Sequence, residues 1–371
     1  MWVYMGANLG IRPFLGIFGY KYGYMNVNTL HITPEILGVI AEIDEFKGTW
    51  RVLGNLAPER LLSLKRIATI ESIGSSTRIE GSRLNDREVE ALLANIQIHK
   101  FESRDEQEVM GYAAVMNTIF ENFEDIPVTE NYIKQLHRDL LKYNEKDVRH
   151  RGEYKKHSNQ VEAFDVDGKS IGVVFDTASP FDTPFRMQDL VSWTQKTLEE
   201  KMLHPLLVIA VFVVEFLAIH PFQDGNGRLS RILTTYLLLK SGYAYVPFVS
   251  MESIIEQNKQ GYYLALRQTQ GTLSSEAVNW QPWVVFFLNV LLKQKQRLAL
   301  KLEQEYVLLG SLPELSLKIL GVVKSRGQTT IGEITILTGA NRNTIKKHLG
   351  KLVANGQLQQ HGSGKGTFYT H

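Results

Sequence analysis

The chain of 371 residues contains no cysteine. Disulfides, thiol nucleophiles and cysteine-bound zinc are therefore excluded, and a reducing cytoplasm is the expected compartment. We expect no targeting segment, and the sequence shows no internal repeats or low-complexity tracts. The formal net charge is only +2, so no global field selects a partner. Hydrophobic residues make up 44% of the chain, enough for a substantial core, and the length suits two or three domains.

No apolar run is long enough to predict a membrane span. Residues 205–219 read PLLVIAVFVVEFLAI, with Glu215 as the one charge, whereas a span needs about twenty apolar residues. This pattern instead predicts a buried central helix. Pro221 disfavours the helical conformation in the residue before it, so we expect the helix to end at His220. A histidine there would have little freedom to move.

A glycine-containing turn follows that histidine. Gly225 and Gly227 flank Asn226, and glycine allows successive backbone N–H groups to point into one concavity. Residues 228–240 then have the apolar spacing of a helix, whose N-terminus attracts anions. These features predict a phosphate site.

Charged residues around the turn support this interpretation. Arg228 and Arg231 are three residues apart and so lie on one helical face. A guanidinium fork binds two phosphate oxygens at once. Asp224 is either a helix cap or, beside a polyphosphate, a ligand for Mg²⁺, which often takes one or two carboxylates plus phosphate and water. The P-loop pattern is absent here, and a dinucleotide fingerprint would need a third glycine and a preceding strand.

Residues 220–231, HPFQDGNGRLSR, resemble the Fic-domain signature HPFxDGNGRxxR at every defining position. The resemblance extends over most of residues 30–300. Residues 30–48 resemble the N-terminal extension of longer Fic proteins, and residues 133–141 resemble an early core helix. Residues 172–184 resemble the β-hairpin flap, although they depart from the commoner Gly-x-x-His-x-x-Pro-Pro form.

Most Fic proteins transfer AMP from ATP to a protein hydroxyl, and the resemblance implies the same here. It makes His220 the base that takes the hydroxyl proton and Asp224 the ligand of Mg²⁺. Tyr262 and Tyr263 resemble a pair lining the adenine and ribose pocket; the alternative is an ordinary aromatic helix face. The implied ATP and phosphate contacts are Glu80, Phe222, Gln223, Gly225, Asn226, Gly227, Arg228, Arg231, Tyr262 and Tyr263. Phe222 would also anchor the loop in the core. The flap would dock the target by strand addition through Val174, Phe175, Asp176 and Thr177.

A second segment resembles the Fic inhibitory motif, Ser/Thr-x-x-x-Glu-Gly/Asn. Ser76 and Glu80 lie four residues apart, on one face of a helical stretch that begins near Pro58, and Gly81 is a natural helix stop. The resemblance implies that Glu80 pairs with Arg231 and blocks the γ-phosphate, as in class II members. Two alternatives stay open: a solvated glutamate, or a carboxylate that activates water for AMP removal.

The C-terminal residues differ in character. Residues 315–327, 330–338 and 341–355 predict three helices, with Asn341 or Asn343 as the last cap, and two short strands follow around a glycine-rich turn. This order resembles a winged helix-turn-helix. Basic residues without acids after Glu333 favour a nucleic-acid surface, and the alternative is protein contact or dimerisation. The basic residues are Arg342, Lys346, Lys347, Lys351 and Lys365.

The sequence thus predicts a mainly α protein, with a Fic-type helical core, a β-hairpin flap and a small C-terminal winged helix-turn-helix. Its predicted parts are an extension at 1–24, an N-terminal helical region with the inhibitory helix at 25–110, a catalytic core at 111–300 and the winged-helix-like domain at 310–371. The predicted activity is self-inhibited adenylyl transfer to Ser, Thr or Tyr of a target protein, for which the chain itself is one candidate. The alternatives are AMP removal, another phosphoryl-type transfer, and a DNA-binding regulator with a nucleotide-sensing core. No membrane partner is expected, and a homodimer would fit the family.

Overall fold

The computed structural model describes residues 27–53, 58–94, 101, 103–164, 170–310 and 313–371. The predicted extension, 1–24, lies outside these residues. The chain divides into two compact units at Gln296/Arg297, within helix α11 (Gln281–Gly310). The N-terminal helices belong to the same unit as the helices around residues 220–231. None of the described helices is both long and apolar enough to cross a membrane.

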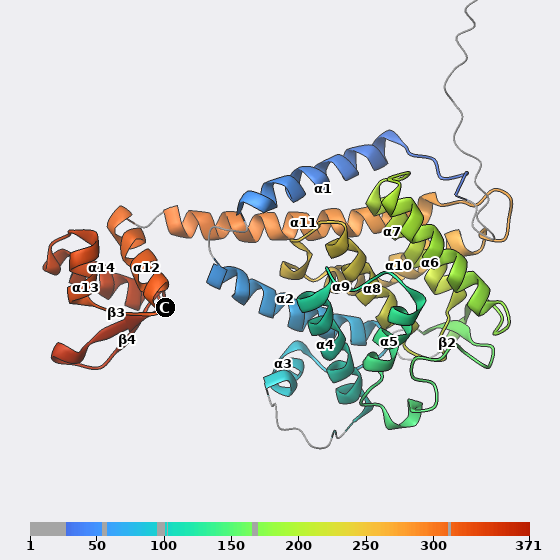
Figure 1. The fold of residues 1–371 in the computed structure, drawn as a ribbon, viewed down its shortest axis with the longest axis horizontal. Helices are drawn as coiled ribbons and strands as arrows, with labels where there is room; N and C mark the ends of the chain where they lie inside the picture. The colour runs from blue at the N-terminus through green and yellow to red at the C-terminus, as the bar shows by residue number, and fades with distance from the viewer. Residues whose placement is uncertain (1–26, 54–57, 95–100, 102, 165–169, 311–312) are drawn as a thin grey trace, which may run out of the picture. The chain divides into compact units, whose positions relative to one another are not determined.

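The first unit is helical, as predicted (Figure 1). Side-chain oxygens at Ser103, Thr129 and Ser250 cap three of its helices. Besides α11, its helices are α1 (Pro34–Leu53), α2 (Pro58–Ile79), α3 (Asp86–Ala94), α4 (Arg104–Asn122), α5 (Glu130–Leu140), α6 (Thr183–Glu199), α7 (Pro205–Ile219), α8 (Asn226–Lys240), α9 (Met251–Gln257) and α10 (Lys259–Gln270).

Helix α7 is the centre of this unit. Every residue from Leu206 to Ile219 is buried, because α7 is apolar on all sides and packs against α6, α8 and α10. The predicted end at His220 is confirmed: that residue is the C-cap, in the left-handed conformation with φ 51° and ψ 59°. Helix α8 begins at Asn226, two residues before the predicted start, so the glycine turn runs directly into its first turn.

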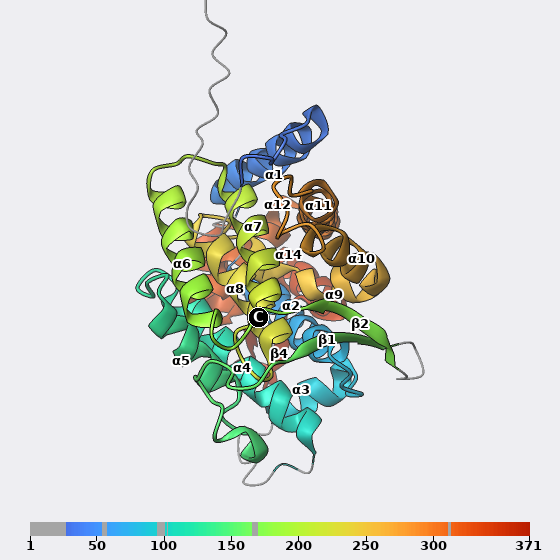
Figure 2. The ribbon, with the colours of Figure 1, turned by 90° about the vertical axis from the view of Figure 1, so that its right-hand side faces the viewer.

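Strands β1 (Gln160–Phe164) and β2 (Ser170–Asp176) form the antiparallel hairpin expected for the flap (Figure 2). The register shifts twice along this pair, which marks bulges. Strand β2 contacts α10, and Ala178 just beyond it donates its backbone N–H to Ala218 O of α7. The hairpin is therefore fixed at its base to the helix that carries His220.

The second unit has the three predicted helices: α12 (Glu314–Arg326), α13 (Ile331–Thr338) and α14 (Arg342–Ala354). Thr330 and Glu333 form a capping box on α13, and Asn341, rather than Asn343, caps α14. The sheet has three strands instead of the predicted two, in the order β3-β5-β4: β3 (Gln328–Thr330), β4 (Gln359–His361) and β5 (Phe368–Thr370). Strand β3 has only three residues, too few to show an alternating pattern, and was therefore not predicted.

Candidate active site

His220 is held at the corner between α7 and the turn. Its backbone N–H donates to Phe216 O at 2.9 Å, and its Nδ1 lies 3.3 Å from Leu217 O. If Nδ1 donates that bond, Nε2 keeps a free lone pair. Burial lowers the pKa of His220 to about 4. The imidazole is therefore neutral near pH 7 and suited to accept a proton at Nε2.

The backbone around His220 is fixed from the side of the hairpin. Lys155 is only 3% exposed; its Nζ donates to Ile219 O and to Thr177 Oγ1, each at 2.9 Å, and its backbone N–H donates to Pro221 O at 2.8 Å. Asn159 Nδ2 adds a bond to Phe222 O at 2.8 Å. These donors satisfy carbonyls that the end of a helix leaves free, and a buried cation suits the negative end of α7.

Sequence reasoning missed Lys155. The adjacent Lys156 is exposed, and nothing in the local sequence distinguishes the two lysines. Burial lowers the pKa of Lys155 to about 8, which still leaves the amine mostly protonated at pH 7. This charge is one of the influences that keep His220 neutral.

Phe222 and Asn226 shape the turn. The Phe222 ring is fully buried and stacks on His137 at 3.8 Å between centroids, so it anchors the loop as predicted rather than facing a ligand. The Asn226 side chain accepts from Phe222 N at 2.9 Å and donates to Phe222 O at 2.7 Å. Both ends of that amide thus hold the loop, whereas a phosphate contact was predicted. Gly225 has φ 79°, which permits the turn into α8.

His137 is a second residue that sequence reasoning singled out only as part of an early helix. Its Nδ1 accepts from Gly152 N at 3.0 Å, so Nε2 carries the proton and donates to Asp224 O at 2.9 Å. Burial lowers the pKa of His137 to about 4, so it stays neutral. His137 therefore holds the backbone of Asp224 in position.

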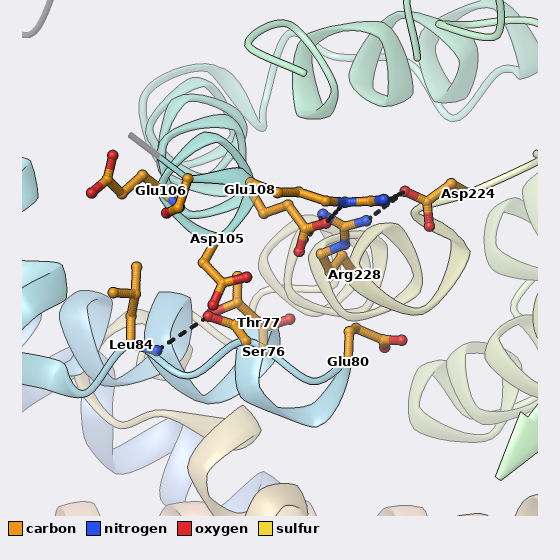
Figure 3. A network of polar contacts seen from close by, with 12 residues as sticks. Ser76, Thr77, Glu80, Leu84, Asp105, Glu106, Glu108, Asp224 and Arg228 are labelled. Atoms are coloured by element: carbon orange, nitrogen blue, oxygen red, sulfur yellow. Dashed lines mark hydrogen bonds and ion pairs between the residues drawn. The ribbon is translucent and has the colours of Figure 1, made fainter. Parts of the chain in front are cut away.

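Arg228 points to two carboxylates (Figure 3). Its Nη2 lies 3.0 Å from Asp224 Oδ2, and its Nη1 lies 3.1 Å from Glu108 Oε2 on α4. Arg104, also on α4, bonds Glu108 at 2.8 Å and Asp224 Oδ2 at 2.9 Å. Burial opposes ionisation of Asp224, but Arg228 and Arg104 hold its pKa below the usual value. Sequence reasoning did not find Arg104 or Glu108, because α4 is more than a hundred residues from the motif.

Arg231 meets the predicted inhibitory segment. It is 2% exposed; its Nε donates to Ser76 Oγ at 2.8 Å, and its Nη2 donates to Glu80 Oε1 at 2.8 Å. Burial favours the neutral guanidinium, but the Glu80 charge raises the pKa of Arg231. A Cβ added at Gly227 would overlap the Glu80 carboxylate, so this carboxylate lies against the first turn of α8. Glu80, at the end of α2 in Figure 3, therefore lies beside the N-terminus of α8, where an anion is favoured.

Among the described residues, four of the buried polar atoms without a hydrogen-bond partner belong to residues 220–231: Gln223 Oε1, Arg228 Nε, Arg228 Nη1 and Arg231 Nη1. Buried polar groups normally have partners, so these atoms indicate a place for ligand or water. Asp224 is the one predicted metal ligand, and its side chain is 36% exposed. A Mg²⁺ held mainly by phosphate and water needs no more than one carboxylate, so Asp224 fits it. In the described part of the chain, no three His, Asp or Glu side chains cluster as a protein-built metal site.

Tyr262 is 3% exposed and packs edge-on against Tyr263 and Trp283. Its ring therefore belongs largely to an aromatic cluster, whereas Tyr263 is half-buried. Of the flap residues, Val174, Phe175 and Asp176 lie in β2, and their side chains fall outside the described part. Thr177 follows the strand and accepts from Lys155.

Comparisons with known proteins agree with the sequence resemblance. Residues 127–238 match the Fic/DOC family, and residues 312–370 match a bacterial protein family of unknown function, DUF977. Curated relatives named protein adenylyltransferase Fic include that of Drosophila sechellia, 28% identical over 205 residues, which are 55% of this chain and 38% of the relative. That of Aedes aegypti is 29% identical over 209 residues, 54% of this chain and 38% of the relative. The chain thus spans about two fifths of the length of these relatives.

Solved structures of Fic proteins have the same fold. A Fic family protein from Desulfovibrio desulfuricans G20 matches with a TM-score of 0.61 and 24% identity, over 92% of this chain and 96% of the other. A Fic domain-containing signaling protein from Bacteroides thetaiotaomicron matches with a TM-score of 0.56 and 26% identity, over 69% of this chain and 94% of the other. Together with the motif at residues 220–231, these matches show that the chain contains a Fic domain.

Proposed function

We propose that the first unit is a protein adenylyltransferase, which moves AMP from ATP to a Ser, Thr or Tyr hydroxyl of a target protein. One observation carries the proposal: a half-buried, neutral His220 is fixed beside the N-terminus of α8, and the Glu80 carboxylate lies against that same turn. A base and an anion site next to each other are what nucleotidyl transfer requires, because such transfer depends mainly on positioning and charge stabilisation. The names of the curated relatives support the same activity.

The proposed reaction is a displacement at the α-phosphorus of ATP. Nε2 of His220 takes the proton of the target hydroxyl, and the hydroxyl oxygen bonds to the α-phosphorus of ATP. The bond from the α-phosphorus to the bridging oxygen breaks, and pyrophosphate leaves. Backbone N–H groups at the start of α8 would hold the α-phosphate, while Arg228 and Arg231 would receive the β- and γ-phosphates. Mg²⁺ on Asp224 would neutralise phosphate charge.

The contacts of Glu80 support the proposed inhibition. Its carboxylate occupies both Arg231 and the first turn of α8, so a γ-phosphate and Glu80 would compete for the same guanidinium. Two anions beside one another in a partly buried site repel strongly. We therefore propose that the enzyme is slow until Glu80 moves. The target segment would pair with the edge of β2.

The deciding experiment compares labels. The Glu80→Gly variant is incubated with ATP labelled at the α or at the γ position, with and without a cell lysate, and labelled protein is detected. We expect the α label on protein at a rate well above that of the unmodified chain. Glu80→Gly combined with His220→Ala should retain ATP binding and lose about 10²–10⁴-fold in transfer. Transfer of the γ label would mean kinase chemistry, and equal α labelling with and without Glu80 would remove its inhibitory role.

A second candidate function belongs to the C-terminal unit. Helix α14 carries exposed basic side chains and is preceded by α13 across a short turn, the arrangement of a helix-turn-helix. The exposed basic residues are Arg342, Lys346, Lys347 and Lys351. Such a surface fits the phosphate backbone of DNA.

Removal of AMP from a target at the same His220 site remains the alternative for the first unit, and release of labelled AMP from a modified protein would identify it.

A further inference from the structure

Arg78 lies two residues before Glu80 and takes no part in the site described above. Its guanidinium makes a bidentate pair with Glu256 of α9, through Nε to Oε1 at 2.6 Å and Nη2 to Oε2 at 3.0 Å. Its Nη1 donates to Asp86 Oδ1 at 2.9 Å and to Leu84 O at 3.1 Å. Its Nη2 also bonds Ser75 Oγ at 3.2 Å. We refer to these residues together as the Arg78 cluster.

The Arg78 cluster holds the chain on both sides of Glu80. Glu256 ties the last turn of α2 to α9, while Leu84 and Asp86 belong to the segment that returns after Gly81 and starts α3. The Arg78 side chain is 23% exposed and that of Glu256 is 29% exposed. A fork-to-fork pair in such a partly buried position fixes geometry as well as contributing energy.

Glu80 itself makes fewer contacts than Arg78 does. Glu80 lies beyond the end of α2, its side chain is 33% exposed, and its ion pair is with Arg231 at 2.8 Å. The turn behind it is closed by two backbone bonds to Thr77 O, from Glu80 N and Ser82 N, each at 3.1 Å. The same turn includes Gly81 at φ 105°, a conformation that glycine adopts without strain. The position of Glu80 therefore depends on how firmly the two flanking segments are fixed.

We propose that Arg78 is a positioning residue for the inhibitory glutamate. It clamps the end of α2 against α9 and α3, and so keeps Glu80 on Arg231 and against the first turn of α8. Loss of the clamp would free the turn and expose Arg231 to a nucleotide. This inference rests on the proposed function, in which Glu80 competes with the γ-phosphate.

The test is a gain of activity, which unfolding cannot produce. Arg78→Met replaces the aliphatic part of the side chain, lacks the guanidinium and so removes every polar contact. We expect transfer of the α label to rise about tenfold above the unmodified chain, since bonds to a charged group are worth about that factor or more, and to remain below the rate of Glu80→Gly. Glu256→Gln removes the same bidentate pair from the α9 side and should raise transfer in the same direction.

Two controls make the assignment specific. Arg66 is another arginine of α2 that pairs with α3, through Glu90 at 3.3 Å, but both side chains are more than half exposed and far along the helix from Glu80. Arg66→Met should leave transfer unchanged. The double variant Arg78→Met with Glu80→Gly should transfer at the rate of Glu80→Gly alone, because no inhibitory carboxylate remains to be released.

Hydrogen exchange gives a readout that does not depend on transfer. The amides of Glu80 and Ser82 should exchange faster in Arg78→Met than in the unmodified chain or in Arg66→Met. If Glu80→Gly activates and neither Arg78→Met nor Glu256→Gln does, the clamp is refuted and the proposed function stands. If Glu80→Gly itself fails to activate, the inhibitory role of Glu80 falls, while unchanged exchange in Arg78→Met would separately refute the clamp.

Discussion

The start of α8 and the start of α14 both carry basic side chains, yet in opposite environments. Arg228 and Arg231 are 2% exposed, and each faces a carboxylate far away in the sequence, Glu108 and Glu80 respectively. On α14, Arg342, Lys346 and Lys347 are exposed. A buried charge without a partner is costly, so the paired guanidiniums of α8 indicate an organised binding site. The exposed charges of α14 need no partner and would act through the field they present to a polyanion.

Among these predictions, the largest effect on transfer is expected from Lys155, which fixes the backbone around His220. Lys155→Met, made with Glu80→Gly, should lower transfer between about tenfold and a hundredfold, because the carbonyl of Ile219 and Thr177 both lose a charged donor beside His220. Lys155→Arg should retain more activity. Steady-state kinetics should place the loss mainly in kcat rather than in KM for ATP.

Lys240 provides a matched control for Lys155. Its Nζ also donates to two backbone carbonyls, Glu124 O at 2.7 Å and Ile126 O at 2.8 Å, but at the far end of α8. Lys240→Met should leave transfer unchanged. An equal loss of transfer in both variants would mean that Lys155 acts on stability alone. The contacts of Lys155 beside His220 would then have no specific effect on transfer.

The next effect concerns the exposed face. In the full chain, Lys346→Ala with Lys347→Ala should weaken DNA binding about tenfold at moderate salt and lower the slope of log affinity against log salt by about 2. Transfer should not change. Lys318→Ala is the control, since this exposed lysine of α12 pairs with Glu314 at 2.9 Å. DNA binding that does not depend on salt concentration, or no DNA binding at all, would favour a protein partner for this unit.

The smallest effect is a pH dependence that should be nearly absent. Since the pKa of His220 is about 4, lowered from 6.5 by burial, the base form is present throughout the range above about pH 5. The value of kcat/KM for Glu80→Gly should therefore change less than about twofold between pH 7 and 5.5 and, on the acid side, fall only as the pH approaches 4. An inflection near 6.5 would show that His220 is solvated, like the side chains of α14.

Sequence patterns predicted much of the fold because the signals are local. The apolar run at 205–219, the proline after His220 and the glycine turn placed α7, its end and the start of α8 within two residues. The candidate cap Asn341 placed the start of the last C-terminal helix in the same way. For the site, the sequence placed Glu80 and Ser76 on one face, and the structure brings both to Arg231.

Other assignments depended on which segments meet. Asn226 was predicted to hold phosphate, but its amide is taken by the Phe222 backbone. Lys155 is buried and Lys156 is exposed although both share one sequence environment. Arg78 looked like any charged residue of a helix, and its partner Glu256 lies 178 residues away. None of these outcomes is visible in local spacing.

The sequence by itself determined where the base, the turn and the candidate anion site lie along the chain, because periodicity, proline and glycine act over a few neighbouring residues. Tertiary structure alone decided which charge meets which: Arg228 with Glu108, Arg231 with Glu80 and Arg78 with Glu256. The physical reason is that a buried charge is stable only with an opposite charge or dipole beside it, and in this fold those partners come from other helices, far away in the chain.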